Sequence, residues 1–189
     1  MSLPSLLALL GILCWVGYEL LLRRREDAAA GTWRADGRDR GSTRLLLSCY
    51  AASVAVVVLF GRASIGELPG WARWFGVVLL AAGLALRAWG MHTLGRYYTR
   101  TLRTVDAQRV VREGPYRLIR HPGYCGSLLV WTGYALGLGS WPATLIVAAL
   151  LLVAYTWRIG AEERLLLTAF GDEYATYRRG SKRLIPFVY

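Results

Sequence analysis

Two stretches of the sequence concentrate residue types that could hold a charged ligand. The first is GPYRLIRHPGYCGSLL, residues 114–129. Pro122 follows His121 there, and proline is favoured at the first helical position because that position needs no N–H donor. The pattern therefore predicts a helix that begins at Pro122. Its positive N-terminal end and the bare backbone at Gly123 would suit a carboxylate or another anion.

Side chains around this helix start could complete a binding site. Tyr124 and Ser127 are three residues apart and share one face of the first turn. The upstream sequence EGPY is typical of a turn, which would let Tyr116 fold back toward the same place. His121 is either a ligand contact or an interfacial residue, and its type alone does not decide between them.

The second stretch is WRIGAEERLLLTAFG, residues 157–171, which has helical spacing up to a glycine suited to end a helix. Arg158 and Glu162 are four residues apart, so they share a face with Tyr155, while Glu163 points about 100° away. Ionisable groups directly beside a membrane span are costly unless they are paired or functional. The alternative is an ordinary surface ion pair, which contributes only about 0.3–0.5 kcal/mol.

Long apolar runs must position these two stretches. The chain has 189 residues, 55% of them hydrophobic, and a positive mean hydropathy. We therefore expect an all-α integral membrane protein with about five transmembrane helices, several near the lower length limit of about 17 residues and so tilted. The expected spans are 3–22, 45–60, 71–86, 123–139 and 143–157.

Basic residues indicate how the chain crosses the membrane, because cytoplasmic loops attract them. Seven lie in 23–44, seven in 96–120 and six in 158–183, whereas only Arg62 and Arg73 fall on the other side. This distribution predicts an outside N-terminus and a cytoplasmic C-terminus, with Arg87 snorkelling from the inner end of its span. Arg112 and Arg117 could serve this sidedness alone. The first span is followed, not preceded, by arginines, so we expect it to stay as an anchor.

The composition excludes other classes. A net charge of +11 in a soluble protein would suggest nucleic-acid binding, but here the arginines flank apolar spans, so we expect no nucleic-acid partner. The three cysteines lie within or beside apolar runs and form no C-x-x-C pair. They predict neither a disulfide framework nor a metal site.

Only SWP, residues 140–142, separates the last two expected spans, so they must form an antiparallel helical hairpin. Gly133 and Gly137 form a G-x-x-x-G pattern that would let another helix approach closely. The hairpin would bring the connection before the fourth span and the C-terminal tail together on the cytoplasmic side.

GPYRLIRHPGYCG, followed beyond the hairpin by RIGAEERLLLTAFGDEYATYRRGSKRLIPF, resembles the isoprenylcysteine carboxyl methyltransferase family and its bacterial and phospholipid methyltransferase relatives. The match runs from Gly90 to Phe187 and rests on two linked motifs. The resemblance implies a membrane enzyme that uses S-adenosylmethionine, held in a cytoplasmic pocket between the connection before the fourth span and the C-terminal helix. In agreement, no G-x-G-x-x-G lies between a strand and a helix.

The resemblance also implies roles for individual residues. The cofactor-contacting positions are Gln108, Arg109, Val110, Val111, Tyr116, His121, Pro122, Gly123, Tyr124 and Glu162. Arg158 matches an arginine implicated in holding the substrate, and we expect it to be the catalytic residue. Gln108 departs from the pattern, because eukaryotic members often have histidine at that position.

The chemistry implied by the resemblance needs no catalytic triad. Methyl transfer from a sulfonium has a good leaving group, so the protein mainly aligns the reactants and excludes water. A carboxylate acceptor needs no base and suits a bidentate contact with Arg158. An amine acceptor would need a group such as Glu163 or His121 to take its proton. We therefore prefer carboxyl O-methylation of a lipophilic, isoprenylcysteine-like acceptor over phospholipid or other lipid N-methylation.

Two alternatives come from other classes. Membrane sterol reductases, which use NADPH, share a similar R-H-P-x-Y-x-G and a similar ending, but they are much longer and differ from AEER in the tail. A non-enzymatic membrane scaffold would require both motifs to be coincidental.

We expect one membrane domain over 1–189, with the first three spans in 1–91, a cytoplasmic loop at 23–44 and a methyltransferase core in 92–189. The acceptor would be a lipophilic or lipidated molecule that enters from the bilayer, and no obligate protein partner is evident. Arginine greatly outnumbers lysine, which indicates a GC-rich genome and a bacterial cytoplasmic membrane.

Overall fold

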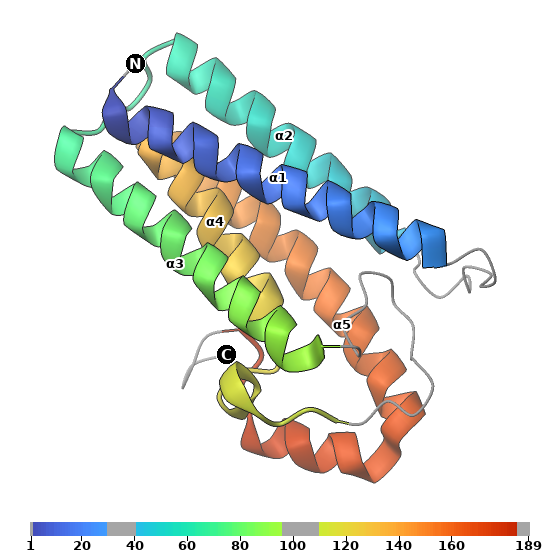
Figure 1. Cartoon of the computed structure of the whole chain (residues 1–189). Helices are drawn as coiled ribbons and strands as arrows, with labels where there is room; N and C mark the ends of the chain where they lie inside the picture. The colour runs from blue at the N-terminus through green and yellow to red at the C-terminus, as the bar shows by residue number, and fades with distance from the viewer. Residues whose placement is uncertain (1, 30–40, 96–109, 185–189) are drawn as a thin grey trace.

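The structure is a computed structural model that describes residues 2–29, 41–95 and 110–184. Within these ranges the chain is helical, and the only strand-like pairings are two isolated β-bridges. In chain order the elements are α1 Leu3–Ala29, α2 Ser42–Arg62, α3 Gly70–Leu94, η3 Gly114–Arg117, α4 Pro122–Leu138 and α5 Trp141–Gly180. Figure 1 shows the five α-helices in one bundle, which confirms the predicted all-α fold.

The bundle has the dimensions and surface of a membrane protein. Of the described helices, α1, α2, α3 and α5 are long and apolar enough to cross a membrane. α4 has 17 residues, about 26 Å of helix, which is at the lower limit for a span. Large apolar side chains cover the outer faces: Leu59 is 63% exposed, Trp71 75% and Val153 66%. Such exposure suits surrounding lipid and would be unfavourable in water.

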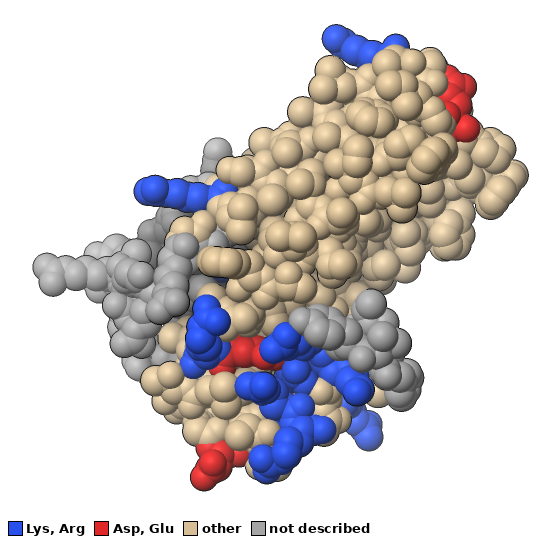
Figure 2. Space-filling model, turned by 180° about the vertical axis from the view of Figure 1, so that it is seen from behind, with Lys and Arg blue, Asp and Glu red and all other residues tan. Residues whose placement is uncertain are grey.

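Charged side chains are distributed accordingly. Figure 2 shows a face of the bundle with almost no charge along its middle, and with most of the Lys, Arg, Asp and Glu side chains gathered at one end. A few charged side chains also lie at the opposite end. The uncharged middle is the part that hydrocarbon would surround.

The helix ends extend beyond the predicted spans. α1 runs to Ala29 and α2 begins at Ser42, so both enter the segment 23–44 that we predicted as a loop, and α3 continues to Leu94. An apolar run in the sequence indicates only the part of a helix that lies inside hydrocarbon, and not where the helix ends. Once a helix is nucleated, further turns add at little cost, so polar residues continue it outside the bilayer.

α3 and α4 meet backbone to backbone through glycines. A Cβ at Gly83 would lie 2.6 Å from Gly126 O, and a Cβ at Gly133 would lie 2.6 Å from Gly76 O. No methyl group fits at these distances, so the two helices approach as closely as their backbones allow. The G-x-x-x-G pattern is therefore confirmed to admit close neighbours: α3 at Gly133, and α1 at Gly137, where a Cβ would lie 2.6 Å from Ala8 Cβ.

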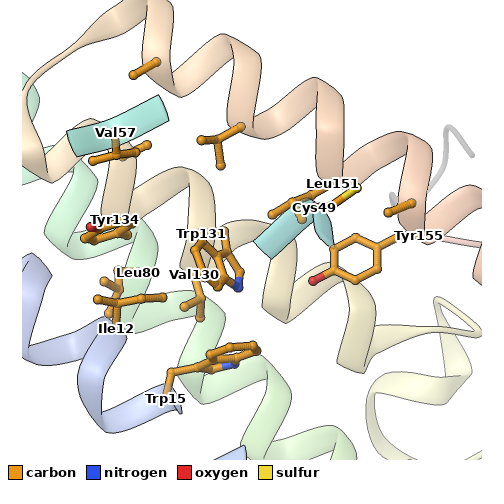
Figure 3. Close-up of a cluster of buried hydrophobic side chains, with 14 of the residues drawn as sticks. Ile12, Trp15, Cys49, Val57, Leu80, Val130, Trp131, Tyr134, Leu151 and Tyr155 are labelled. Carbon is orange, nitrogen blue, oxygen red and sulfur yellow. The ribbon is translucent and has the colours of Figure 1, made fainter. Parts of the chain in front are cut away.

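α4 is the central helix, and its side chains form the core with side chains of the other four helices. Val130 has no exposed surface and Trp131 is 2% exposed. Trp131 stacks on Tyr50 with ring centroids 4.9 Å apart, and Trp15 meets both rings edge-on. Figure 3 shows Trp131, Trp15 and their apolar neighbours in this cluster. Each aromatic pair adds about 0.5–1.5 kcal/mol beyond area burial, so the cluster holds α1 and α2 against α4.

The predicted hairpin is present, because only Gly139 and Ser140 separate α4 from α5. Gly139 has φ 93°, a left-handed conformation that glycine adopts without steric cost. The hairpin turn is bound to the connection between α2 and α3: Leu68 N donates to Gly139 O (2.8 Å), and Trp141 N donates to Gly66 O (3.1 Å). Backbone hydrogen bonds therefore join the α2–α3 and α4–α5 connections at this end of the bundle.

α5 is longer than a membrane crossing. Its 40 residues correspond to about 60 Å, against about 30 Å of hydrocarbon. The apolar part at 143–157 crosses, and the rest projects beyond the bundle. The helix breaks at Gly171, which has φ 50° and ψ −125°, so the predicted stop is confirmed. Residues 172–180 then form a helical segment that turns back beneath the bundle (Figure 1).

Candidate active site

The start of α4 is the first part of the site. The helix begins at Pro122 with His121 as its N-cap, as the sequence predicts. The C-terminal part of the chain holds the residues in front of it: Arg120 N donates to Lys182 O (2.7 Å), and His121 N donates to Arg183 O (3.1 Å). Residues far apart in the sequence thus fix the backbone that leads into the helix.

Tyr124 joins the two predicted stretches. Its hydroxyl donates to Glu162 Oε2 (2.7 Å) and accepts from Arg158 Nε (3.2 Å). Arg158 Nη1 also donates to Thr43 Oγ1 of α2 (2.9 Å). Arg158 is only 3% exposed. The alternative of an ordinary surface ion pair is therefore wrong, because Arg158 and Glu162 meet in the interior through the tyrosine hydroxyl.

His121 lies between two carboxylates. Its Nδ1 is 3.9 Å from Glu162 Oε1, and its Nε2 is 3.5 Å from Glu163 Oε1. Nε2 is buried and makes no hydrogen bond with any described residue. Leaving a buried polar atom without a hydrogen bond costs about 1–3 kcal/mol, so such an atom in a site is a candidate ligand contact.

Glu163 is the centre of a buried ion cluster. Arg120 Nε donates to its Oε1 (2.9 Å), and Arg183 Nε and Nη2 donate to its Oε2 (3.2 and 3.0 Å). Burial would raise the pKa of Glu163, but the neighbouring His121 and Arg120 outweigh it and lower the pKa from 4.5 to about 2. Glu163 is therefore ionised at neutral pH and poorly suited to the general-base role considered for an amine acceptor.

Tyr116 turns back toward the start of α4, as expected. A Cβ at Gly90 would lie 3.6 Å from Tyr116 Oη and 3.3 Å from Pro122 Cγ, so both side chains pack beside the same glycine of α3. Tyr177 Oη donates to Tyr116 O (2.7 Å). Burial raises the pKa of Tyr177 to about 12, so its hydroxyl stays neutral and can donate at physiological pH.

Arg87 does not snorkel, and that prediction is wrong. It is 9% exposed and points into the bundle, where it forms an ion pair with Glu19 of α1. Its Nη1 also donates to Gly123 O (3.1 Å) and Ser127 Oγ (2.9 Å) in the first turn of α4. Buried partners for the guanidinium, which periodicity cannot reveal, hold it inside rather than at the interface.

The predicted site residues have different outcomes. The residues that meet around the start of α4 are Tyr116, His121, Pro122, Gly123, Tyr124, Arg158 and Glu162. Val111 is buried and Val110 half-buried. Gln108 and Arg109 lie outside the described residues. A role for any of them in binding a cofactor stays a prediction.

Sequence reasoning missed Arg120, Arg183, Glu19 and the structural role of Glu163. Arg120 had a signal, because it directly precedes His121 in the motif. Arg183 and Glu19 had none, since each meets its partner only through the tertiary fold. Among the described residues no group of His, Cys, Asp and Glu could hold a metal ion.

The chain matches the phospholipid methyltransferase family over residues 71–173. It is 30% identical to protein-S-isoprenylcysteine O-methyltransferase B of Arabidopsis thaliana over 154 residues, 78% of each chain. It is also 35% identical to the cobalt-zinc-cadmium resistance protein CzcN of Cupriavidus metallidurans, over 69% of this chain and 61% of that one. Residues 71–173 contain α3 from its second residue, α4 and most of α5, and with them His121, Tyr124, Arg158 and Glu162.

A solved structure has the same fold. It is described as a eukaryotic intramembrane Ras methyltransferase, isoprenylcysteine carboxyl methyltransferase, and it superimposes with a TM-score of 0.57 at 24% identity. The superposition covers 77% of this chain and 52% of the other, so this chain spans about half of that longer protein. At this identity the likeness supports the arrangement of the helices. These relatives include eukaryotic and bacterial proteins, so the bacterial source stays a prediction.

Proposed function

This chain belongs to the family of membrane methyltransferases that contains the isoprenylcysteine carboxyl methyltransferases, and from that premise we propose that it methylates the carboxylate of a lipophilic acceptor with S-adenosylmethionine as the methyl donor. The chain is a membrane methyltransferase. The methyl donor, the acceptor and the roles of the residues are the proposal. A match to a methyltransferase family does not favour the reductase or scaffold alternatives.

The residues at the start of α4 fit S-adenosylmethionine. Among the described residues, a Cβ at Gly123 would have only Arg87 Nη1 within 4 Å beyond its own turn of helix, at 3.6 Å, so a ligand can approach the backbone there. The Glu162 side chain is 29% exposed and can accept hydrogen bonds from ammonium or hydroxyl groups. His121 Nε2 is buried 3.5 Å from Glu163 Oε1 and makes no hydrogen bond with a described residue, so it could bind the donor instead. We infer that these residues and Tyr124 would hold the donor.

Methyl transfer requires the protein mainly to align the donor with the acceptor. When bound, S-adenosylmethionine supplies an electrophilic methyl group on a positively charged sulfur. The chain must hold the acceptor in line with that methyl group and keep water away. The acceptor carboxylate is already deprotonated at neutral pH, so no residue has to take a proton.

The observation that carries the proposal is the position of Arg158. Its guanidinium is buried where α5 leaves the bilayer, and Tyr124 and Thr43 fix it from two sides. A planar guanidinium held in this way is suited to a bidentate contact with a carboxylate. The apolar outer faces of the helices would let a lipophilic acceptor approach from the bilayer.

Lipid N-methylation is the second candidate, because the matching family is described as phospholipid methyltransferase. It would require a group that takes a proton from the amine. Glu163, with a pKa of about 2, is a poor choice for that task. His121, the other residue considered for this task, lies beside Tyr124 with ring centroids 5.8 Å apart.

Calorimetric titration of the detergent-purified protein with S-adenosylhomocysteine and, separately, with NADPH tests the donor. We expect S-adenosylhomocysteine to bind, and to bind more weakly in Glu162→Gln and His121→Ala. Binding of NADPH alone would refute the methyltransferase proposal.

A methyl-transfer assay tests the acceptor with two radiolabelled reactions, one on an S-farnesylated cysteine with a free carboxylate and one on phosphatidylethanolamine. O-methylation yields an ester that releases methanol in base, whereas an N-methyl product is stable in base. A label found only in base-stable lipid would refute carboxyl methylation.

Arg158→Ala should lower turnover at least a hundredfold, because the contact with the acceptor is lost, and should weaken S-adenosylhomocysteine binding by no more than about tenfold, because only the hydrogen bond from Arg158 to Tyr124 is lost on the donor side. Arg164→Ala is the matched control, since that exposed arginine lies on the same helix away from the cluster. Equal losses of turnover and donor affinity in Arg158→Ala would reassign the residue to the donor.

A further inference from the structure

Two oppositely charged residues from different helices are buried together inside the bundle. Glu19 of α1 is 8% exposed and Arg87 of α3 is 9% exposed, and they form an ion pair. The Trp15 ring lies 5.9 Å from the guanidinium and adds a cation–π contact. Ionisable groups in such a place are expensive, so a pair retained there has a role beyond sidedness.

Arg87 makes hydrogen bonds with the first turn of α4. Its Nη1 donates to Gly123 O (3.1 Å) and Ser127 Oγ (2.9 Å), and Ser127 Oγ itself donates to Gly123 O (3.0 Å). The backbones of α3 and α4 are in direct contact at this point, since a Cβ at Gly126 would lie 2.9 Å from Arg87 N. Arg87 therefore has little freedom to move relative to α4. The carbonyl between His121 and Tyr124 is therefore held by a side chain of another helix.

Glu19 explains why a cation can sit there. The N-terminal end of a helix carries a positive partial charge, so a bare guanidinium beside the first turn of α4 would be repelled. The Glu19 carboxylate neutralises the guanidinium and fixes its orientation toward Gly123. Across the same turn, Arg158 binds the hydroxyl of Tyr124. The turn is thus held from two sides, by Arg87 at its backbone and by Arg158 at its side chain.

We propose that Glu19 and Arg87 are positioning residues for the methyl donor: the ion pair sets the first turn of α4, and through it the geometry of His121 and Tyr124. This inference rests on the proposed function. Glu19 lies outside residues 71–173, so the family match does not reach it. α1, which otherwise resembles a simple membrane anchor, becomes part of the binding site.

The test compares four variants of the detergent-purified full chain by calorimetry with S-adenosylhomocysteine, thermal unfolding and amide hydrogen exchange of the peptide that covers 118–127. They are Glu19→Gln, Ser127→Ala, the swapped pair Glu19→Arg with Arg87→Glu, and the control Glu67→Gln, an exposed carboxylate at the other end of the bundle. Glu19→Gln should weaken binding about tenfold and speed exchange in the first turn of α4. Glu67→Gln should change neither.

The swapped pair separates positioning from simple stability. It restores opposite charges between α1 and α3 but removes the guanidinium that donates to Gly123 O and Ser127 Oγ. Its unfolding temperature should therefore recover while its affinity stays about tenfold weaker than that of the wild type. Recovery of both would overturn the proposal. Ser127→Ala leaves the ion pair intact and removes one contact of Arg87, and we expect about threefold weaker binding. Unchanged affinity and exchange in Ser127→Ala and Glu19→Gln would also overturn it.

Two further outcomes are decisive. A loss confined to the KM of the acceptor, with donor affinity unchanged, would assign Arg87 to the acceptor and refute the positioning role. Failure of the wild-type chain to bind S-adenosylhomocysteine would refute the proposed function. In that case the hydrogen exchange of the apo protein still reports whether the ion pair sets the first turn of α4.

Discussion

Glu163 illustrates how a single carboxylate can hold two distant parts of a chain. It binds Arg120, just before α4, and Arg183, near the end of the described chain, while His121 lies 3.5 Å away. The residue is 3% exposed, so its charge is tolerated only because cations surround it. The same carboxylate therefore links the helix start to the C-terminal segment and keeps His121 in place.

We predict that the stability contributed by Glu163 depends on acid pH. Its pKa in the folded protein is about 2, below the ordinary 4.5, so the contribution is fully present above pH 4.5 and is lost as the pH falls toward 2. A shift of this size corresponds to roughly 3 kcal/mol. Glu163→Gln should therefore be destabilised at neutral pH, and the difference in unfolding temperature from wild type should shrink as the pH approaches 2.

Glu173→Gln is the matched control, because that side chain is 53% exposed and 3.8 Å from its arginine partner. Its effect should be small at every pH. A Glu163→Gln deficit that is constant from pH 6 to pH 2 would show that the cluster does not depend on the charge of Glu163.

Part of this residue-level picture could be predicted from the sequence. Proline after His121 marks a helix start by local rules, and spacing places Arg158 and Glu162 on one face. The partners of Glu163 and Arg87 could not be predicted in this way. Arg183 reaches Glu163 only because the chain turns back after Gly171, and Glu19 reaches Arg87 only because α1 packs near α3.

At the level of the elements, the packing of α3 on α4 is the most demanding contact in the bundle. Gly83 and Gly126 oppose each other so closely that each backbone occupies the space of the other's missing side chain. The same contact places Arg87 beside α4. Any loss of closeness between these helices would therefore also pull the guanidinium away from Gly123.

We predict that Gly83→Ala destabilises the protein by about 1–3 kcal/mol, because its methyl group would lie 2.6 Å from a backbone oxygen that cannot move alone. Thermal unfolding in detergent measures the effect. Gly17→Ala is the control, because Gly17 is also within a helix but a Cβ there would meet no atom of the described residues within 4 Å. That change should be neutral or slightly stabilising. Equal unfolding temperatures of the two variants would contradict the close contact.

Helix positions could be predicted better than helix ends. Apolar runs locate the five spans because hydrocarbon requires them, and a short SWP linker permits only a hairpin. The lengths of α1 and α5 could not be obtained in this way, because polar residues continue both helices beyond their apolar runs. For the same reason Arg87 was misplaced: an arginine at the end of an apolar run has the same local pattern whether it faces water or a buried carboxylate.

At the scale of the whole molecule, the distribution of arginines predicts an outside N-terminus and a cytoplasmic C-terminus. Ser64 and Thr176, both exposed, lie in the α2–α3 connection and in the segment after Gly171. We predict that Ser64→Cys reacts with a membrane-impermeant maleimide on intact cells, whereas Thr176→Cys reacts only after the cells are opened.

The labelling uses a chain whose three natural cysteines have been replaced by alanine, and that chain without a new cysteine is the control for background. Methyl transfer by the alanine variant would show that it is folded. Labelling of Thr176→Cys from outside, with Ser64→Cys protected, would reverse the orientation and put the candidate active site on the wrong side for a cytoplasmic methyl donor.

The two ends of the bundle are held by different kinds of contact. At the end away from the candidate active site, backbone hydrogen bonds join the α2–α3 turn to the α4–α5 turn. At the site end, described side chains join the helices: Glu19 of α1 pairs with Arg87 of α3, and Arg158 of α5 donates to Thr43 of α2. Side chains exchange rotamers and partners faster than whole helices move. Any opening that admits a bulky lipophilic acceptor should therefore begin at the site end, where side-chain contacts have to be exchanged.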